Sequence, residues 1–563
     1  MPKLICMMTL LMVLWVYAYV LMPPAFGVAA TLEKPERQRS GVMSGGTFRR
    51  MLGHDPATLD PALLTDIYGG TVVRQIFNGL VQFDANLRPM PDLAEFWETS
   101  RDGLTWTFTL RRGVRFHHGR EVTAQDVVYS FTRLLNPDQS LPVTELFKSI
   151  QGGNAFIQGK TQQVQGLKAL DRYTFQIVLE EPLAHLLTVL GLANTVVVPQ
   201  EMVEKLGERF ARAPVGTGPF KFVRWQPTQE IVLTANDQYY AGRPFLDTVV
   251  FKIFVGVKYE EAFARFLQGE LDEVIIPSGK IDEVLVDPAY RKFQRIRKPG
   301  LNTLYIGFNM QMKPFDDRRV RQAFNYAVNT QAIVQEITRR GSLVATGILP
   351  PGMPGYDPDL QGYAYHPAKA KRLLTEAGYP NGAGFPRVQL WSIGQSASSK
   401  AELRAYQAYL ADLGVQADIR FASDWPTYKA LLEQGELPMF RLVWYADIPD
   451  PDNFLSPLLH SSSPTNRTFY HNPRVDQLLQ QARKTVDEAQ RIARYREVQH
   501  IVHDDAPWII QHHAVLNYLY QPYVQGIEVS LLGKRFIPLQ KIWLKKYPAE
   551  SATRDTIDVK PQR

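Results

Sequence analysis

The segment 441–454, RLVWYADIPDPDNF, contains the residues best suited to binding a charged ligand. Its first five residues favour a strand, and a turn rich in Asp and Pro follows. Trp444, Tyr445 and Asp447 are therefore expected together at the end of a strand. A carboxylate beside aromatic faces suits an ammonium group, through a charge-assisted hydrogen bond and cation–π attraction. A helix-capping turn built on aspartates accounts for the same residues equally well.

Other groups of residues that could support catalysis or bind a cofactor are incomplete. The segment 153–161, GNAFIQGKT, ends like a phosphate-binding loop, but its first glycine stands one residue too early. The segment 394–398 lacks the last glycine of a G-x-S-x-G nucleophile elbow. His500 and His503 have the spacing of two metal ligands on a helix, without a third ligand nearby in the sequence. We therefore expect no catalytic residue, no metal and no cofactor, with a periplasmic hydrolase or metalloprotein that uses these histidines as the alternative.

Composition narrows the class of protein further. The 563 residues, 45% hydrophobic and 21% charged, indicate a soluble globular chain of two to four domains. The net charge of +7 is spread over a long chain and does not by itself indicate a nucleic-acid partner. The one cysteine is Cys6, so the rest of the chain can contain neither a disulfide nor a cysteine-ligated metal.

The N-terminus predicts export. Lys3 precedes an uncharged apolar run over 4–22, and two prolines and several small residues follow. This order is typical of a signal peptide, which we place at residues 1–30, and it predicts a periplasmic protein. An uncleaved membrane anchor is the alternative, because the run has 19 residues and about 20 span a bilayer.

Strand-like and helix-like segments alternate through the chain, which indicates an α/β fold. Segments rich in aromatic and β-branched residues predict strands at 106–110, 175–179, 249–253, 305–308, 388–391 and 417–421. Helix starts are expected at the TAQD sequence 123–126, at Asp316 or Asp317, and at Pro367. The polar segments 31–45 and 549–563 are expected to be a flexible leader and a disordered tail.

Several motifs between Gly46 and Trp543 resemble, in their order, the peptide- and nickel-binding (family 5) extracellular solute-binding proteins, which include the dipeptide- and oligopeptide-binding proteins. The motifs are TLDP at 58–61, the long segment 92–131, VGTGPFKFVRW at 215–225, the segment 308–328, YHPAKAKRLLTEAGYP at 365–380, and WYADIPDPDNF at 444–454. The resemblance implies two α/β lobes joined by a hinge, with an additional inserted domain. The implied limits are 46–294 for the first lobe with a small domain at about 85–200, 295–515 for the second lobe, and 516–548 for a return to the first.

The resemblance also implies a function. Such a protein is a substrate-binding receptor of an ABC importer, which captures a peptide between its lobes and delivers it to permease subunits in the inner membrane. It implies a monomer without enzyme activity, cofactor or nucleic-acid partner. Binding of a nickel chelate, glutathione or an oligosaccharide is the alternative within the same family.

Candidate ligand residues follow from the resemblance, residue by residue. Asp447, three residues after Trp444, matches the Asp of a W-x-x-D motif that holds a peptide α-ammonium in oligopeptide-binding relatives. Beside it and Tyr445, the further candidates are Trp425, Arg441, Tyr305, Thr65, Ile67 and Ile275.

This chain departs from the relatives in one respect. Dipeptide-binding relatives carry an Arg just before the helix that here ends at Gly414, and that Arg grips the ligand carboxylate. Residues 390–399, LWSIGQSASS, contain neither Arg nor Lys. This weakens the assignment to dipeptides alone, while Arg441 leaves room for a longer peptide, and Thr65 replaces a carboxylate found in some oligopeptide binders.

Overall fold

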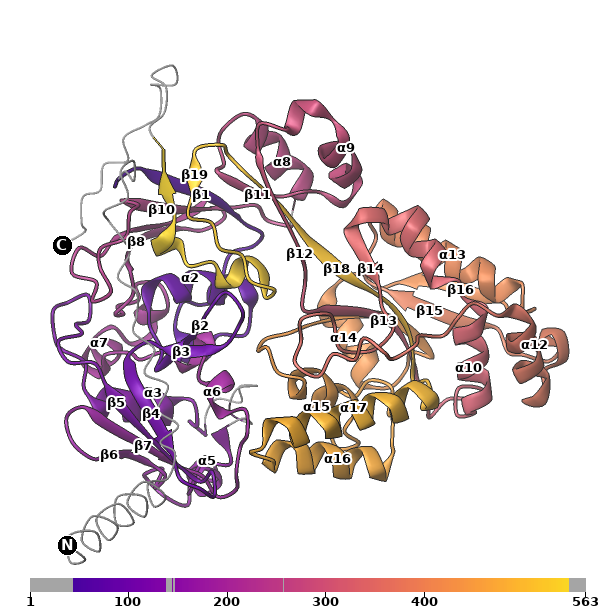
Figure 1. Ribbon diagram of the computed structural model, residues 1–563, viewed down its shortest axis with the longest axis horizontal. Helices are drawn as coiled ribbons and strands as arrows, with labels where there is room; N and C mark the ends of the chain where they lie inside the picture. Colours follow the sequence, from indigo (N-terminus) through magenta and orange to yellow (C-terminus); the bar gives the residue numbers. More distant parts are fainter. Residues whose placement is uncertain (1–43, 138–143, 145–146, 257, 546–563) are drawn as a thin grey trace, which may run out of the picture.

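The computed structural model describes residues 44–137, 144, 147–256 and 258–545. The predicted signal peptide, the predicted tail and nearly all of the predicted leader lie outside these residues. Figure 1 shows two α/β lobes side by side, with the early part of the chain on the left and the later part on the right. No helix in the described ranges combines the length and apolar character that a membrane span needs.

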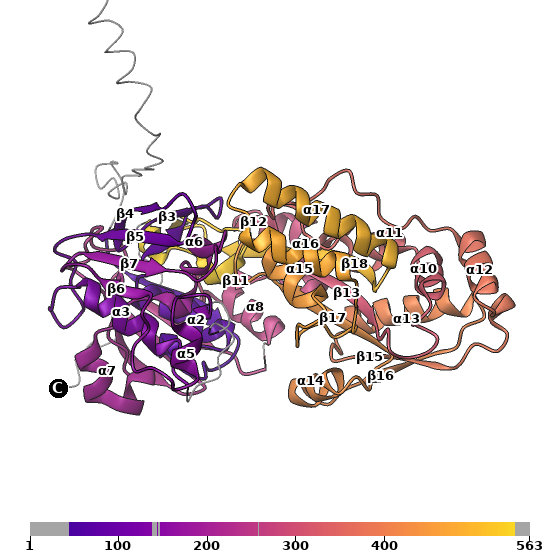
Figure 2. The ribbon, with the colours of Figure 1, turned by 90° about the horizontal axis from the view of Figure 1, so that it is seen from below.

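One long strand connects the two lobes. β18 (Trp508–Tyr520) pairs antiparallel with β13 (Asn302–Phe308) through residues 508–512 and with β12 (Gln294–Pro299) through residues 515–520. The chain therefore crosses between the lobes twice at one place, first after β12 and then along β18. Both views show these strands between the lobes (Figures 1 and 2). Two neighbouring crossing strands are suited to act as a hinge.

The first lobe is built around β1 (Thr47–Leu52), which pairs in parallel with β10 (Thr248–Ile253) and β11 (Glu273–Ile275). β9 (Glu230–Ala235) and β8 (Phe220–Gln226) extend the sheet in antiparallel order. The helices of this lobe are α2 (Ile67–Ile76), α7 (Gln200–Leu206), α8 (Tyr259–Leu267) and α9 (Ile281–Val286). After β18, the chain returns here with β19 (Val524–Gln525) and β20 (Trp543–Leu544).

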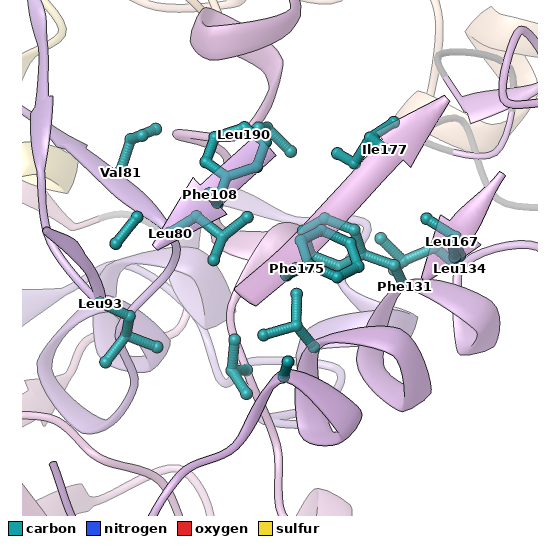
Figure 3. Packing of buried hydrophobic residues seen from close by; sticks show 14 of the residues in the cluster. Leu80, Val81, Leu93, Phe108, Phe131, Leu134, Leu167, Phe175, Ile177 and Leu190 are labelled. Carbon is teal, nitrogen blue, oxygen red and sulfur yellow. The ribbon is translucent and has the colours of Figure 1, made fainter. Parts of the chain in front are cut away.

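A smaller sheet lies at one end of the first lobe. Its order is β4 (Ala94–Thr99), β5 (Thr105–Leu110), β7 (Thr174–Val178) and β6 (Leu167–Ala169), all antiparallel. α3 (Ala124–Arg133) packs on it, and its Phe131 meets Phe175 edge to face at 5.6 Å (Figure 3). The neighbouring elements are the hairpin β2 (Val81–Phe83) and β3 (Pro89–Pro91), α5 (Gly153–Ile157) and α6 (Leu186–Val189). α5 contains the first five residues of the segment 153–161, whose end resembles a phosphate-binding loop.

The second lobe has a sheet in the order β16 (Ala417–Phe421), β15 (Val388–Ser392), β17 (Met439–Tyr445), β13 and β18, with β14 (Ser342–Val344) paired to β18. Its helices are α10 (Arg318–Ala327), α11 (Thr330–Ile333), α12 (Pro367–Glu376), α13 (Ala397–Ala411), α14 (Trp425–Glu433), α15 (Asp452–Leu459), α16 (Pro473–Lys484) and α17 (Glu488–Asp505). The six predicted strands and the three predicted helix starts are confirmed. The residue limits proposed for the lobes and the small domain stay predictions.

The GTGPF segment before β8 packs its backbone against the end of α2. The Gly218 N–H donates to the Ile76 carbonyl oxygen at 2.7 Å, and a Cβ added at Gly218 would lie 2.5 Å from the Ile76 carbonyl carbon. We expect Gly218→Ala to lower the free energy of unfolding by about 1–3 kcal/mol, because the backbone must shift to admit the methyl group. Gly279→Ala is the matched control, since its Cβ would meet nothing within 4 Å. Urea unfolding with equal midpoints for both variants would contradict this close packing.

Candidate functional site

One aspartate in the loop after β17 has an exposed carboxylate. The Trp444 indole N–H donates to the Asn453 carbonyl oxygen at 2.8 Å, and the Asp447 backbone N–H donates to Asn453 Oδ1 at 2.9 Å. These bonds fix the path of the loop without using the Asp447 carboxylate, whose side chain is 60% exposed. Asp447 is therefore available to a ligand, beside the exposed ring of Tyr445.

The other aspartates of this loop are structural. Asp450 is buried, and its carboxylate accepts from Arg491 at 2.8 and 3.0 Å. Asp452 is buried in α15 and accepts from Arg483 and Ser456. The interpretation as a structural, Asp-rich turn therefore fits these two residues, and Asp447 is the one left as a candidate for an ammonium group.

On the first-lobe side of the site lies the start of α2. Asp66 is the N-cap of α2, and its Oδ1 accepts from the backbone N–H groups of Tyr68 and Gly69 at 2.8 Å. This cap holds Thr65 and Ile67 outside the core: both side chains are exposed, Ile67 by 46%. An exposed isoleucine beside a fixed turn is suited to contact an apolar part of a ligand.

Two tyrosines of the first lobe lie near Tyr445 of the second lobe. Tyr68 from α2 and Tyr259 from α8 interact electrostatically with each other and with Tyr445 of the second lobe. Burial is the main cause that raises the pKa values of Tyr68 and Tyr259, so both phenols stay neutral and can donate hydrogen bonds. Neither Tyr68 nor Tyr259 could be found from the sequence, because neither belongs to a motif and they lie far apart in the chain.

Arg535 is a further residue that the sequence analysis missed. It lies in the returning segment, in the short 3₁₀ helix Gly533–Phe536, and reaches across to the second lobe. Its Nη2 donates to the Ala446 carbonyl oxygen at 2.7 Å, and its Nη1 lies 3.4 Å from Asp447 Oδ1. A positively charged side chain therefore lies beside Asp447, the residue expected to bind a ligand ammonium group.

Two of the predicted site residues lie at the margins of this group. Trp425 is the first residue of α14, 51% exposed, with its ring edge-on to Tyr428 at 6.3 Å. Ile275 ends β11 and is partly buried against the core of the first lobe. Of the predicted residues, the structure brings Tyr445 and Asp447 together with the α2 side of the first lobe.

Tyr305 and Arg441 are corrections to the predicted site. The side chain of Tyr305 is 2% exposed and stacks on Trp508 at 3.9 Å, in the core of the second lobe. Arg441 is 10% exposed, and its Nη2 donates to Glu402 Oε2 at 2.8 Å. Glu402 also binds the buried His512 at 3.1 Å. Arg441 thus balances a buried carboxylate and does not offer its charge to a ligand in this conformation.

The two histidines considered as metal ligands have different surroundings. His500 Nε2 lies 3.0 Å from Asp357 Oδ2, whereas the His503 ring stacks on Tyr363 at 4.4 Å. Burial lowers the pKa of His503, which favours its neutral form. Across 44–545, as far as the structure describes that range, no group of three His, Cys, Asp or Glu side chains is arranged to hold a metal ion.

Comparison with known proteins shows which proteins the chain is similar to. A family model described as "Bacterial extracellular solute-binding proteins, family 5 Middle" matches residues 88–466. Heme-binding protein A of Haemophilus influenzae is 34% identical over 87% of this chain and 91% of its own length. The dipeptide-binding protein of Escherichia coli is 32% identical over 85% of this chain and 91% of its own length.

A solved structure agrees with the fold. The periplasmic binding protein DppA of Helicobacter pylori, in complex with the peptide STSA, superposes with a TM-score of 0.75 at 29% identity, over 90% of this chain and 99% of that one. The predicted fold class of two α/β lobes, a hinge and an inserted domain is thereby confirmed. The chain belongs to family 5 of the bacterial extracellular solute-binding proteins, which are non-enzymatic receptors of ABC transport.

Proposed function

We propose that this protein is the peptide receptor of an ABC importer, that it captures its ligand between the two lobes in the periplasm, and that it delivers it to permease subunits in the inner membrane. The observation that carries this proposal is the Asp447 carboxylate, exposed at the end of β17 and beside Tyr445. The dipeptide-binding protein and the peptide complex among its relatives support a peptide as the ligand.

The chemistry of the site fits the N-terminus of a peptide. A free α-ammonium can form charge-assisted hydrogen bonds with Asp447 and lie against the face of Tyr445. Tyr68 and Tyr259, which stay neutral, can donate to peptide carbonyl groups from the other lobe. Closing the lobes excludes water, which strengthens each of these electrostatic contacts.

The carboxylate end of the ligand is held differently from that in dipeptide-binding relatives. β15 ends at Ser392 and α13 begins at Ala397, and no residue of 390–399 is Arg or Lys. The side chain of Arg441, which borders this segment, is occupied by Glu402. A cation for the ligand carboxylate must therefore come from another part of the chain.

Mass spectrometry under native conditions tests the proposal. The protein is purified from the periplasm of its own organism, and bound small molecules are identified after release. We expect one or more peptides with a free N-terminus. A nickel chelate or an oligosaccharide in the site would contradict the peptide proposal and favour another ligand within the family.

A further inference from the structure

A cavity in the first lobe has two arginines in its wall, and one of them contacts Asp447. It measures about 340 Å³ and lies between α2, the β2–β3 hairpin and the returning segment 528–541. Arg535 lines it and also contacts Asp447 across the lobes. Arg74 of α2 lines it as well, with its guanidinium 3.8 Å from the ring centre of Phe536. Arg535 thus connects the wall of the cavity with the proposed peptide site.

The carboxylates that line the same cavity already have partners. Glu528 pairs with Lys541 at 2.9 Å, Asp84 accepts two backbone N–H groups of its own turn, and Asp92 accepts from Asn78 and Tyr240. Arg74 forms no ion pair with any residue that the structure describes, and its Nη2 donates instead to the Gly191 carbonyl oxygen at 2.9 Å. Arg535 has the exposed Asp447 as its one acidic neighbour within ion-pair distance in the described ranges.

Arg74 in the cavity wall and Lys534 next to Arg535 both have lowered pKa values, mainly because they are buried. Burial, and then repulsion from Arg535, lowers the pKa of Arg74 to about 9. Burial, and then repulsion from Arg50, lowers the pKa of Lys534 to about 8. Glu273, itself paired with Arg50 at 2.9 Å, offsets the effect on Lys534 only in part. Because repulsion from Arg535 adds to the lowering at Arg74, a negative charge placed between the two arginines would be stabilised.

We propose that this cavity is a subsite for a negatively charged group of the ligand, a carboxylate held by Arg535 and Arg74 while the ligand ammonium is held by Asp447. The inference rests on the proposed function and names the class of ligand: acidic peptides or peptide-like molecules. The buried Ser530 hydroxyl lines the same cavity, has no hydrogen-bond partner among the residues that the structure describes, and can add a donor to the anion.

The test compares two tripeptides of nearly equal shape, Ala-Glu-Ala and Ala-Gln-Ala, which differ by one negative charge. Isothermal titration calorimetry at pH 7 measures both Kd values for the wild-type protein, Arg535→Gln and Arg74→Gln. We expect the Glu peptide to bind the wild type at least about tenfold more tightly, the size of a hydrogen bond to a charged group. In both variants this preference should fall toward unity.

The ratio of the two affinities separates the subsite from general effects on folding or lobe closure, because such effects change both peptides alike. Arg372→Gln is the control, an exposed arginine on α12 with its side chain 67% exposed, and it should keep the preference. Arg74→Lys should keep part of it, because the charge remains.

Equal binding of the two peptides to the wild type, or an unchanged preference in Arg535→Gln, would overturn this inference and leave the peptide receptor intact. If neither tripeptide binds, the proposed function and this inference both fall.

Discussion

Asp447→Asn is expected to weaken the binding of peptides with a free N-terminus by about 10- to 100-fold. A hydrogen bond to a charged group contributes about 1.5–3 kcal/mol, and each 1.4 kcal/mol is a factor of ten in affinity. The loss should be near the upper end, because Arg535 lies 3.4 Å from Asp447. Without the carboxylate, that cation repels the ligand ammonium. The fold should tolerate the change, since the Asp447 side chain is 60% exposed.

Calorimetry with one peptide in two forms measures this effect. The peptide with a free N-terminus should lose affinity for Asp447→Asn, whereas its N-acetylated form should bind the wild type and the variant about equally weakly. Asp412→Asn, an exposed carboxylate at the end of α13, is the matched control and should bind as the wild type does. If the free peptide binds Asp447→Asn as tightly as it binds the wild type, Asp447 does not hold the ammonium.

The part of the site that could be predicted is local in sequence. A strand that runs into an Asp- and Pro-rich turn placed Tyr445 and Asp447 at one strand end, and β17 ends at Tyr445 as expected. The same reasoning could not tell whether a side chain elsewhere on this strand is exposed or buried. Arg441 is buried because its partners Glu402 and His512 come from α13 and β18.

The part that could not be predicted depends on contacts between distant segments. Arg535 reaches Asp447 because β18 carries the chain back beside the first lobe. Tyr68 and Tyr259 come near Tyr445 only because the two lobes face each other. Alternating patterns predicted individual strands and helices well, since those patterns reflect local burial. Sheet order depends instead on which distant strands pair, and the resemblance to a family supplied that information.

Asp452→Asn is expected to cause the largest loss of stability, about 3 kcal/mol or more at pH 7. Asp452 is 3% exposed, and its carboxylate accepts from Arg483 at 2.9 Å and from Tyr495 at 3.1 Å. It also lies 3.9 Å from His185, which belongs to the region of the small domain. Removing one partner from a buried ion pair costs about 3–5 kcal/mol, because the remaining charges are left unbalanced. The lower end applies here, since the side chain of Arg483 is 44% exposed and water screens its charge.

The loss should depend on pH in a defined direction. Burial alone would raise the pKa of Asp452, but His185 and Arg483 outweigh it and lower the pKa to about 2 from an ordinary value of 3.8. A carboxyl group with a lowered pKa in the folded state stabilises the protein fully above its unfolded pKa, and this stabilisation is lost as the pH falls toward 2. The shift corresponds to about 2 kcal/mol.

Urea unfolding of the wild type and Asp452→Asn at pH 7, 4 and 2.5 measures this dependence. The difference in unfolding free energy should be nearly the same at pH 7 and pH 4 and should shrink clearly by pH 2.5. Comparing the two proteins at each pH removes the contribution of the other carboxylates, which titrate in both. A difference that stays constant down to pH 2.5 would mean that packing around Asp452, rather than its charge, stabilises this junction. A shrinking difference would show that the ionised carboxylate of Asp452, with Arg483 and His185 as its charged neighbours, stabilises the fold.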